Sequence, residues 1–146
     1  MSLSESDLTD IEQSLIESLP TPPAMAKLQF SNIWIIEWLS PGETQTGQKL
    51  HEWMKDQRPG WSRYQYCKTK SEVIQAIERA THYSQQSGMI PVLHLEAHGG
   101  DMGLAPSNCV DAEFLTWEEL TYPLQQLNLA TRCNLLVVAI SRSSAS

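Results

Sequence analysis

The sequence lacks the features that mark several large classes of protein. Its 146 residues include 10 lysines and arginines against 17 aspartates and glutamates, a formal net charge of −7 at pH 7. Because nucleic-acid affinity depends on basic side chains that neutralise phosphates, this balance argues against a nucleic-acid partner. No run of about 18 apolar residues is present, which argues against a membrane-spanning helix. Residues 1–10 also lack the basic and apolar regions of a secretory signal.

Cysteine is scarce, and the common motifs for cofactors and metals are absent. Cys67, Cys109 and Cys133 are odd in number and show no C-x-x-C spacing, which excludes a regular disulfide framework and a zinc knuckle. We therefore expect three thiols without a catalytic role in a reducing, cytoplasmic compartment. The sequence contains no phosphate-binding glycine loop, no H-E-x-x-H zinc motif and no G-x-S-x-G nucleophile motif, so we expect no cofactor.

What is present falls into two segments. In residues 1–26, apolar residues at helical spacing predict a helix over 4–19. The prolines that follow it predict a stiff linker. Residues 27–146 are expected to form one domain. In it, β-branched and apolar runs predict four strands, at 29–39, 62–68, 89–97 and 134–140. The last run is almost continuously apolar, which is typical of a strand covered on both faces.

Helices are expected between these strands. Ser40, Thr69 and Thr116 are each followed three residues later by glutamate, a pattern that predicts a helix start at each position. Gly88 is expected to end the second of these helices, and a loop of about 18 residues is expected between the third strand and the third helix. Strands that alternate with helices predict an α/β fold with a mainly parallel sheet and flanking helices.

The candidate chemistry lies where two strands end, because parallel sheets bind ligands at the carboxyl ends of their strands. His98 follows the third predicted strand and Ser141 follows the fourth. Gly99 and Gly100 are expected to place the imidazole of His98 in an exposed loop, where backbone N–H groups can serve an oxyanion hole. The nearby acids Asp101, Asp111 and Glu113 are expected to be solvated.

A metal site is the alternative interpretation of this region. Strand alternation puts His94, Glu96 and His98 on one face, and imidazole and carboxylate suit zinc or iron. Residues four apart on a strand are separated by roughly 13 Å, so one ion cannot bind both histidines. We therefore expect no metal, and we expect His94 to be a partly buried, hydrogen-bonded imidazole.

Several segments together resemble one family. PVLHLEAHGG at 91–100, LTWEEL at 115–120 and LNLATRCNLLVV at 127–138 resemble, in this order, the core of bacterial CHAT domains, which are caspase-like cysteine peptidases. The resemblance covers about residues 28–141 in element order. It implies a three-layer, caspase-like (Rossmann-like) fold, His98 as the catalytic base, and a protein or peptide substrate.

The same resemblance puts Ser141 at the position of the family's nucleophilic cysteine. A hydroxyl is a weaker nucleophile than a thiolate, and Arg142 stands where the family has glycine. The family also has further strands after this position, so we expect the C-terminal part of the fold to be missing and peptidase activity to be low. The alternative is a non-catalytic regulatory module of a bacterial defence or cell-death system. Such a module would associate with a second copy or a partner chain through its last strand.

Overall fold

The computed structural model describes residue 10, residues 30–109 and residues 111–141. Their elements follow in the order β1 (Asn32–Trp38), α2 (Thr46–Gln57), β2 (Ser62–Tyr66), α3 (Lys70–Ser87), β3 (Pro91–Gly100), β4 (Gly103–Ala105), β5 (Leu115–Thr116), α4 (Trp117–Ala130) and β6 (Leu136–Ser141). Apart from Asp10, the helix expected at 4–19 lies outside the described residues, so the division at residue 26 stays a prediction.

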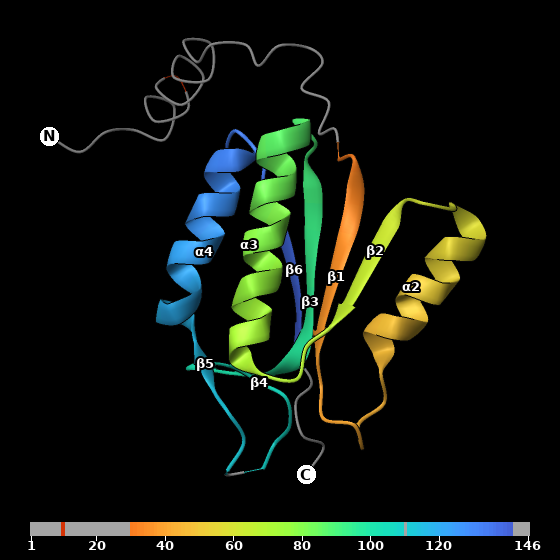
Figure 1. The fold of residues 1–146 in the computed structure, drawn as a ribbon. Helices are drawn as coiled ribbons and strands as arrows, with labels where there is room; N and C mark the ends of the chain where they lie inside the picture. Colours follow the sequence, from red (N-terminus) through yellow and green to blue (C-terminus); the bar gives the residue numbers. More distant parts are fainter. Residues whose placement is uncertain (1–9, 11–29, 110, 142–146) are drawn as a thin grey trace, which may run out of the picture.

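The strands form one open sheet with a parallel main part (Figure 1). β1 pairs in parallel with β2 on one side and with β3 on the other, and β3 pairs in parallel with β6. At the carboxyl end of β3 the sheet continues through β4 and β5, which are antiparallel. The predicted α/β class and the mainly parallel sheet are therefore confirmed.

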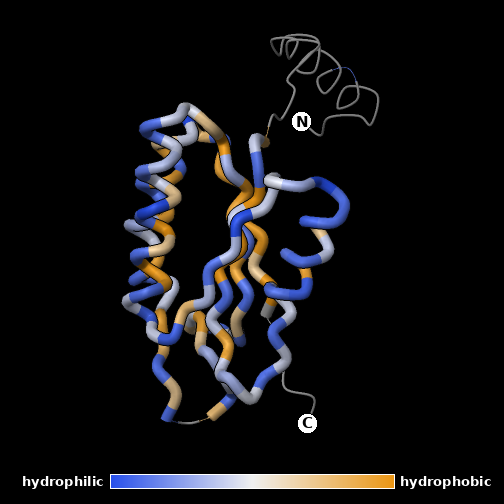
Figure 2. Tube along the Cα trace, turned by 45° about the vertical axis from the view of Figure 1, so that its right-hand side comes forward, coloured by the Kyte–Doolittle hydropathy of each residue, from blue (hydrophilic) through white to orange (hydrophobic). Residues whose placement is uncertain are grey.

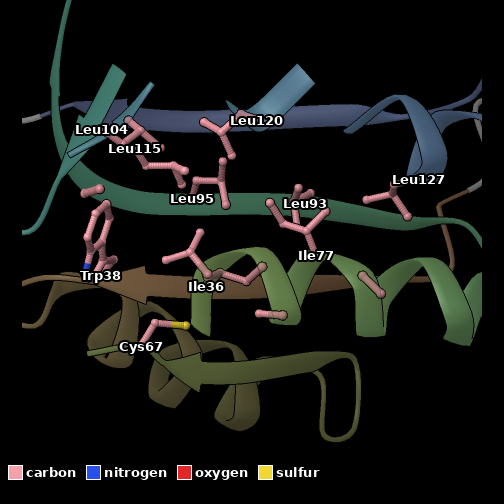
Figure 3. Packing of buried hydrophobic residues seen from close by; sticks show 14 residues of the cluster. Ile36, Trp38, Cys67, Ile77, Leu93, Leu95, Leu104, Leu115, Leu120 and Leu127 are labelled. Atoms are coloured by element: carbon pink, nitrogen blue, oxygen red, sulfur yellow. The ribbon is translucent and has the colours of Figure 1, made fainter. Parts of the chain in front are cut away.

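Alternate residues of the central strands serve opposite faces of the sheet. Ile36 of β1 and Leu93 and Leu95 of β3 belong to a buried cluster that also includes Ile77 of α3 and Leu127 of α4 (Figure 3). Burying one such side chain contributes about 1.5–3 kcal/mol, so this cluster is the main source of stability. Figure 2 shows the same distribution, with apolar residues concentrated in the strands.

The other face of the sheet is in contact with α2. A Cβ atom added at Gly47 of α2 would lie 3.1 Å from Ile35 Cγ2 and 2.8 Å from Glu37 Oε2. Ile35 and Glu37 alternate with Ile36 along β1, so α2 packs on the face that α3 and α4 do not cover. The helices therefore lie on both faces of the sheet.

Two of the three predicted helix starts are correct. Thr69 caps α3 by accepting a hydrogen bond from Glu72 N–H, and Thr116 and Glu119 form a reciprocal capping box at α4. Gly88 ends α3 in the left-handed conformation, at φ 71°. These signals act between residues a few positions apart, which is why they can be read in the sequence.

The remaining predicted helix start, at Ser40, is wrong. α2 begins at Thr46 with Gln45 at its N-cap position, whereas the sequence predicted the N-cap at Ser40, five residues earlier. The segment between them is a turn, in which Glu43 N–H donates to the Ser40 carbonyl at 2.8 Å. The Gln45 side chain donates to the carbonyls of both Ser40 and Glu43 at 3.1 Å, so it stabilises the turn at the expense of another helical turn.

Two further predictions are wrong: the loop of about 18 residues after the third predicted strand, and a last strand that is covered on both faces. β3 runs on to Gly100 and turns into β4, because Gly103 adopts a φ of +154° and packs against the backbone of Leu115. In the described part of the chain β6 pairs only with β3. One face of β6 is exposed: Leu136 by 44%, Val138 by 37% and Ile140 by 44%.

Candidate active site

His98 lies in β3 near its carboxyl end, on the face of the sheet opposite α3 and α4. Its neighbour Ala97 belongs to the buried cluster, so alternation directs the His98 side chain to the other face. His98 is 6% exposed. The expectation of an exposed imidazole in a loop is therefore wrong, because β4 pairs with the end of β3 and extends the strand past His98.

The closest charged partner of His98 comes from the turn before α2. Nε2 of His98 lies 3.1 Å from Oε1 of Glu43, an ion-pair distance. Neither ring nitrogen has an aligned hydrogen bond to any described residue. The sequence analysis missed Glu43 because it assigned this residue to a helix cap. A carboxylate beside an imidazole stabilises the protonated ring, so Glu43 can support His98 as a proton acceptor.

The backbone of Ser141 lies beside the strand that carries His98. β3 and β6 are neighbours, and Ser141 pairs with Ala97, the residue before His98. No other strand lies between the two carboxyl ends. The two predicted positions are therefore adjacent in the backbone of the sheet.

Gly99 and Gly100 form the last part of β3. They pair with Leu104 and Gly103 of β4, so they belong to a strand and are not part of a free loop. A Cβ atom added at Gly100 would meet no atom within 4 Å, so the backbone at this position is open to close approach. Their role as oxyanion donors stays a prediction.

A pocket of about 310 Å³ adjoins these residues. Its lining consists of small residues of β3 and β4 together with residues of the segment that follows: His98, Gly99, Gly100, Gly103, Ala105, Ser107, Asn108, Cys109, Ala112 and Phe114. Cys109 is therefore part of the same pocket as His98. No local sequence signal indicates this placement, because it results from the β3–β4 turn.

A row of buried polar side chains continues along the same face. Glu37 is fully buried and accepts hydrogen bonds from Tyr64 Oη at 2.6 Å and from Gly47 N–H at 2.5 Å. Burial, and then the hydrogen bond to Glu37, raises the pKa of the Tyr64 hydroxyl. Each oxygen of the carboxylate therefore accepts one hydrogen bond, and Glu37 joins β1, β2 and α2.

His94 and Glu96 make a second buried pair. His94 Nε2 lies 3.3 Å from Glu96 Oε1, and both residues are buried, so the expected hydrogen-bonded imidazole is confirmed. Within residues 30–109 and 111–141, no group of three or more His, Cys, Asp or Glu side chains is arranged to hold a metal ion.

Another histidine, which the sequence analysis passed over, lies at the opposite end of the sheet. His51 Nδ1 lies 2.7 Å from Ser62 Oγ, and its ring stacks on Tyr64. Burial, and then the nearby charge of Lys55, lowers the pKa of His51. Ser62 is 8% exposed and begins β2, so this pair fastens α2 to the sheet far from His98.

No described helix is both long and apolar enough to cross a membrane. No family model matches the sequence, and no curated protein matches it.

Proposed function

We propose that this chain is a caspase-like cysteine-peptidase module with a three-layer fold. His98 is its general base, and position 141 is the place of the nucleophile. The observation that carries the proposal is the parallel pairing of β3 with β6, which brings the backbone of positions 98 and 141 to neighbouring carboxyl ends of the sheet. Helices on both faces of a mainly parallel sheet also support it.

The chemistry needs a proton acceptor beside a nucleophile. In this mechanism the imidazole of His98 takes the proton of the nucleophile, and Glu43 stabilises the imidazolium that results. A serine hydroxyl at position 141 is a poor nucleophile without a fully oriented triad. We therefore propose that the chain, in a cytoplasmic setting, binds proteins or peptides and cleaves them slowly or not at all.

A gain-of-function variant tests this proposal. Ser141→Cys in the full chain is expected to hydrolyse members of a panel of fluorogenic peptides that differ in the residue before the cleaved bond. The activity is expected to disappear when His98→Ala is added. Ser143→Cys, which places a thiol two residues further on, is the matched control. All variants carry Cys109→Ser, so that the pocket thiol does not contribute. A folded Ser141→Cys protein that cleaves no peptide would contradict the proposal.

A second function is favoured by a different observation. β6 is an edge strand in the described part of the chain, and it exposes Leu136, Val138 and Ile140 on one face. Unpaired edges with exposed apolar side chains favour association with another chain. The chain would then act as a non-catalytic interaction module, and static light scattering over a concentration series tests this function.

A further inference from the structure

The pocket beside His98 has an uncharged lining and a floor of small residues. Three glycines and Ala105 contribute to it, and no described lining residue carries an Asp, Glu, Lys or Arg side chain. Its volume of about 310 Å³ is at the lower end of the range for small-molecule sites. The pocket therefore suits a small uncharged group, such as a short acyl chain.

His98 lines this pocket together with Ala105. His98 and Ala105 are cross-strand partners in the antiparallel pair of β3 and β4, so their side chains stand on the same face. Both residues line the pocket. His98 is 94% buried, and no aligned hydrogen bond from a described residue reaches its nitrogens. Nε2 lies 3.1 Å from the Glu43 carboxylate, so the ring nitrogen without a partner among the described residues is Nδ1. Such a buried nitrogen is rare, and beside a pocket it points to a ligand or a proton donor.

Cys109 also lines this pocket. The Cys109 N–H donates to Ser107 Oγ at 3.3 Å, and the Cys109 carbonyl accepts from Ala112 N–H at 3.1 Å. These two bonds fix the backbone on both sides of the thiol. Cys109 is exposed and forms no disulfide, so it is accessible to reagents.

The other two cysteines differ from Cys109: Cys133 shares its exposure but not its pocket, and Cys67 shares neither. Cys133 is exposed but does not line this pocket, and Cys67 is completely buried. Burial raises the pKa of the Cys67 thiol to about 12, with a smaller contribution from Glu72. Cys133 therefore serves as the control for an exposed thiol outside the pocket, and Cys67 as the control for a buried thiol.

We propose that Cys109 and His98 form a thiol–imidazole reaction centre in this pocket, with Cys109 as the nucleophile toward small uncharged acyl groups. His98 takes the proton of the Cys109 thiol, and Sγ attacks the carbonyl carbon of an ester or amide. The bond to the leaving alcohol or amine breaks, and that group receives the proton from His98. Water then hydrolyses the thioester, which releases a carboxylic acid and restores the thiol.

This centre shares His98 with the proposed function but does not use position 141. No hydrogen bond joins the Cys109 thiol to the His98 imidazole in this structure, and catalytic hydrogen bonds often form only once a substrate is bound. The Ser141→Cys assay is carried out with Cys109 replaced, and the experiment below keeps Ser141. The two proposals can therefore fail separately.

Site-resolved alkylation of the full chain tests the reaction centre. With iodoacetamide near neutral pH, we expect Cys109 to be alkylated about tenfold faster than Cys133, and Cys67 to be protected. The Cys109 rate is expected to rise at a lower pH than the Cys133 rate. His98→Gln should reduce the Cys109 rate to that of Cys133 and leave Cys133 unchanged. Peptide mass spectrometry measures all three rates, and continued protection of Cys67 shows that the variant is folded.

Acyl transfer is tested in the same way with p-nitrophenyl acetate. We expect acetylation of Cys109 before Cys133, and loss of this preference in His98→Gln. Equal alkylation or acetylation of Cys109 and Cys133 in the wild-type chain would overturn the proposal. A preference for Cys109 that survives in a folded His98→Gln variant would overturn the role of the imidazole. If His98→Gln unfolds, the pH dependence of the two wild-type rates decides, and identical profiles overturn the proposal.

Discussion

The Gly47 N–H donates a hydrogen bond of 2.5 Å to Oε2 of Glu37, a carboxylate that is completely buried. Gly47 is the second residue of α2, where backbone N–H groups have no partner within the helix and where the helix dipole favours a negative charge. Glu37 therefore anchors the start of α2 on β1. The turn before α2 carries Glu43 to His98, so this buried bond also supports the candidate active site.

Removing the charge of Glu37 is expected to destabilise the protein. In Glu37→Gln the amide oxygen can still accept from Gly47 N–H, but the amide N–H can only donate to Tyr64 Oη, so two charge-assisted hydrogen bonds become neutral ones. We expect the free energy of unfolding to fall by about 1–3 kcal/mol, measured by urea denaturation. The exposed Glu52 of α2 gives the matched control, and Glu52→Gln should change stability by less than about 0.5 kcal/mol. Equal effects of the two variants would refute the anchoring role of Glu37.

The close approach of α2 to β1 gives an independent prediction. Gly47→Ala would place a methyl group 2.8 Å from Glu37 Oε2 and 3.1 Å from Ile35 Cγ2, so the helix must move. We expect a loss of about 1–3 kcal/mol. Gly42→Ala is the control, since no atom lies within 4 Å of the added carbon. A Gly47→Ala protein as stable as Gly42→Ala would show that α2 shifts without cost.

The start of α4 depends on one hydroxyl. Thr116 Oγ1 accepts from Glu119 N–H at 3.0 Å, and Glu119 Oε2 accepts from Thr116 N–H at 2.9 Å. Thr116→Ala removes half of this capping box, and we expect it to cost about 0.5–2 kcal/mol in thermal or urea unfolding. Thr121→Ala, on the exposed surface of the same helix, should have a smaller effect. The prediction fails if the order of the two effects is reversed.

The exposed face of β6 predicts self-association that one charge can prevent. Val138 lies in the middle of the exposed apolar row, so Val138→Lys adds a charge to the edge strand. If β6 mediates association, we expect the average mass in static light scattering to rise with concentration in the wild type and to stay monomeric in Val138→Lys. Leu129→Lys changes an exposed residue of α4 and should behave like the wild type. A wild-type chain that is monomeric throughout the series would exclude association between copies.

Stability is expected to depend on pH through Cys67. Burial raises the pKa of this thiol from 9.0 to about 12, so the folded state keeps a proton that the unfolded state releases. This contribution to stability is fully present below pH 9 and is lost as the pH rises toward 12. The resulting slope approaches about 1.4 kcal/mol per pH unit.

Urea unfolding between about pH 7 and about pH 10 measures this slope. Cys67→Ala should flatten the pH dependence, although it also lowers stability at every pH by removing buried volume. Cys133→Ala, at an exposed position, should leave the slope unchanged. A slope that is identical in wild type and Cys67→Ala would show that other groups cause it.

The sequence by itself determined the elements whose signals are local. Thr69, Gly88 and Thr116 mark helix ends correctly, because a cap joins residues only a few positions apart. The alternation of strands and helices was sufficient to predict the mainly parallel sheet. The adjacency of β3 and β6 was expected only from the family resemblance and from their order along the chain.

Tertiary structure decided everything that depends on contacts between distant segments. Glu43 reaches His98 only because the turn after β1 replaces a predicted helical turn. Cys109 joins His98 in one pocket only because β3 turns back into β4. The exposure of β6 likewise depends on which strands pair with it, because an apolar run looks the same at the centre of a sheet and at its edge.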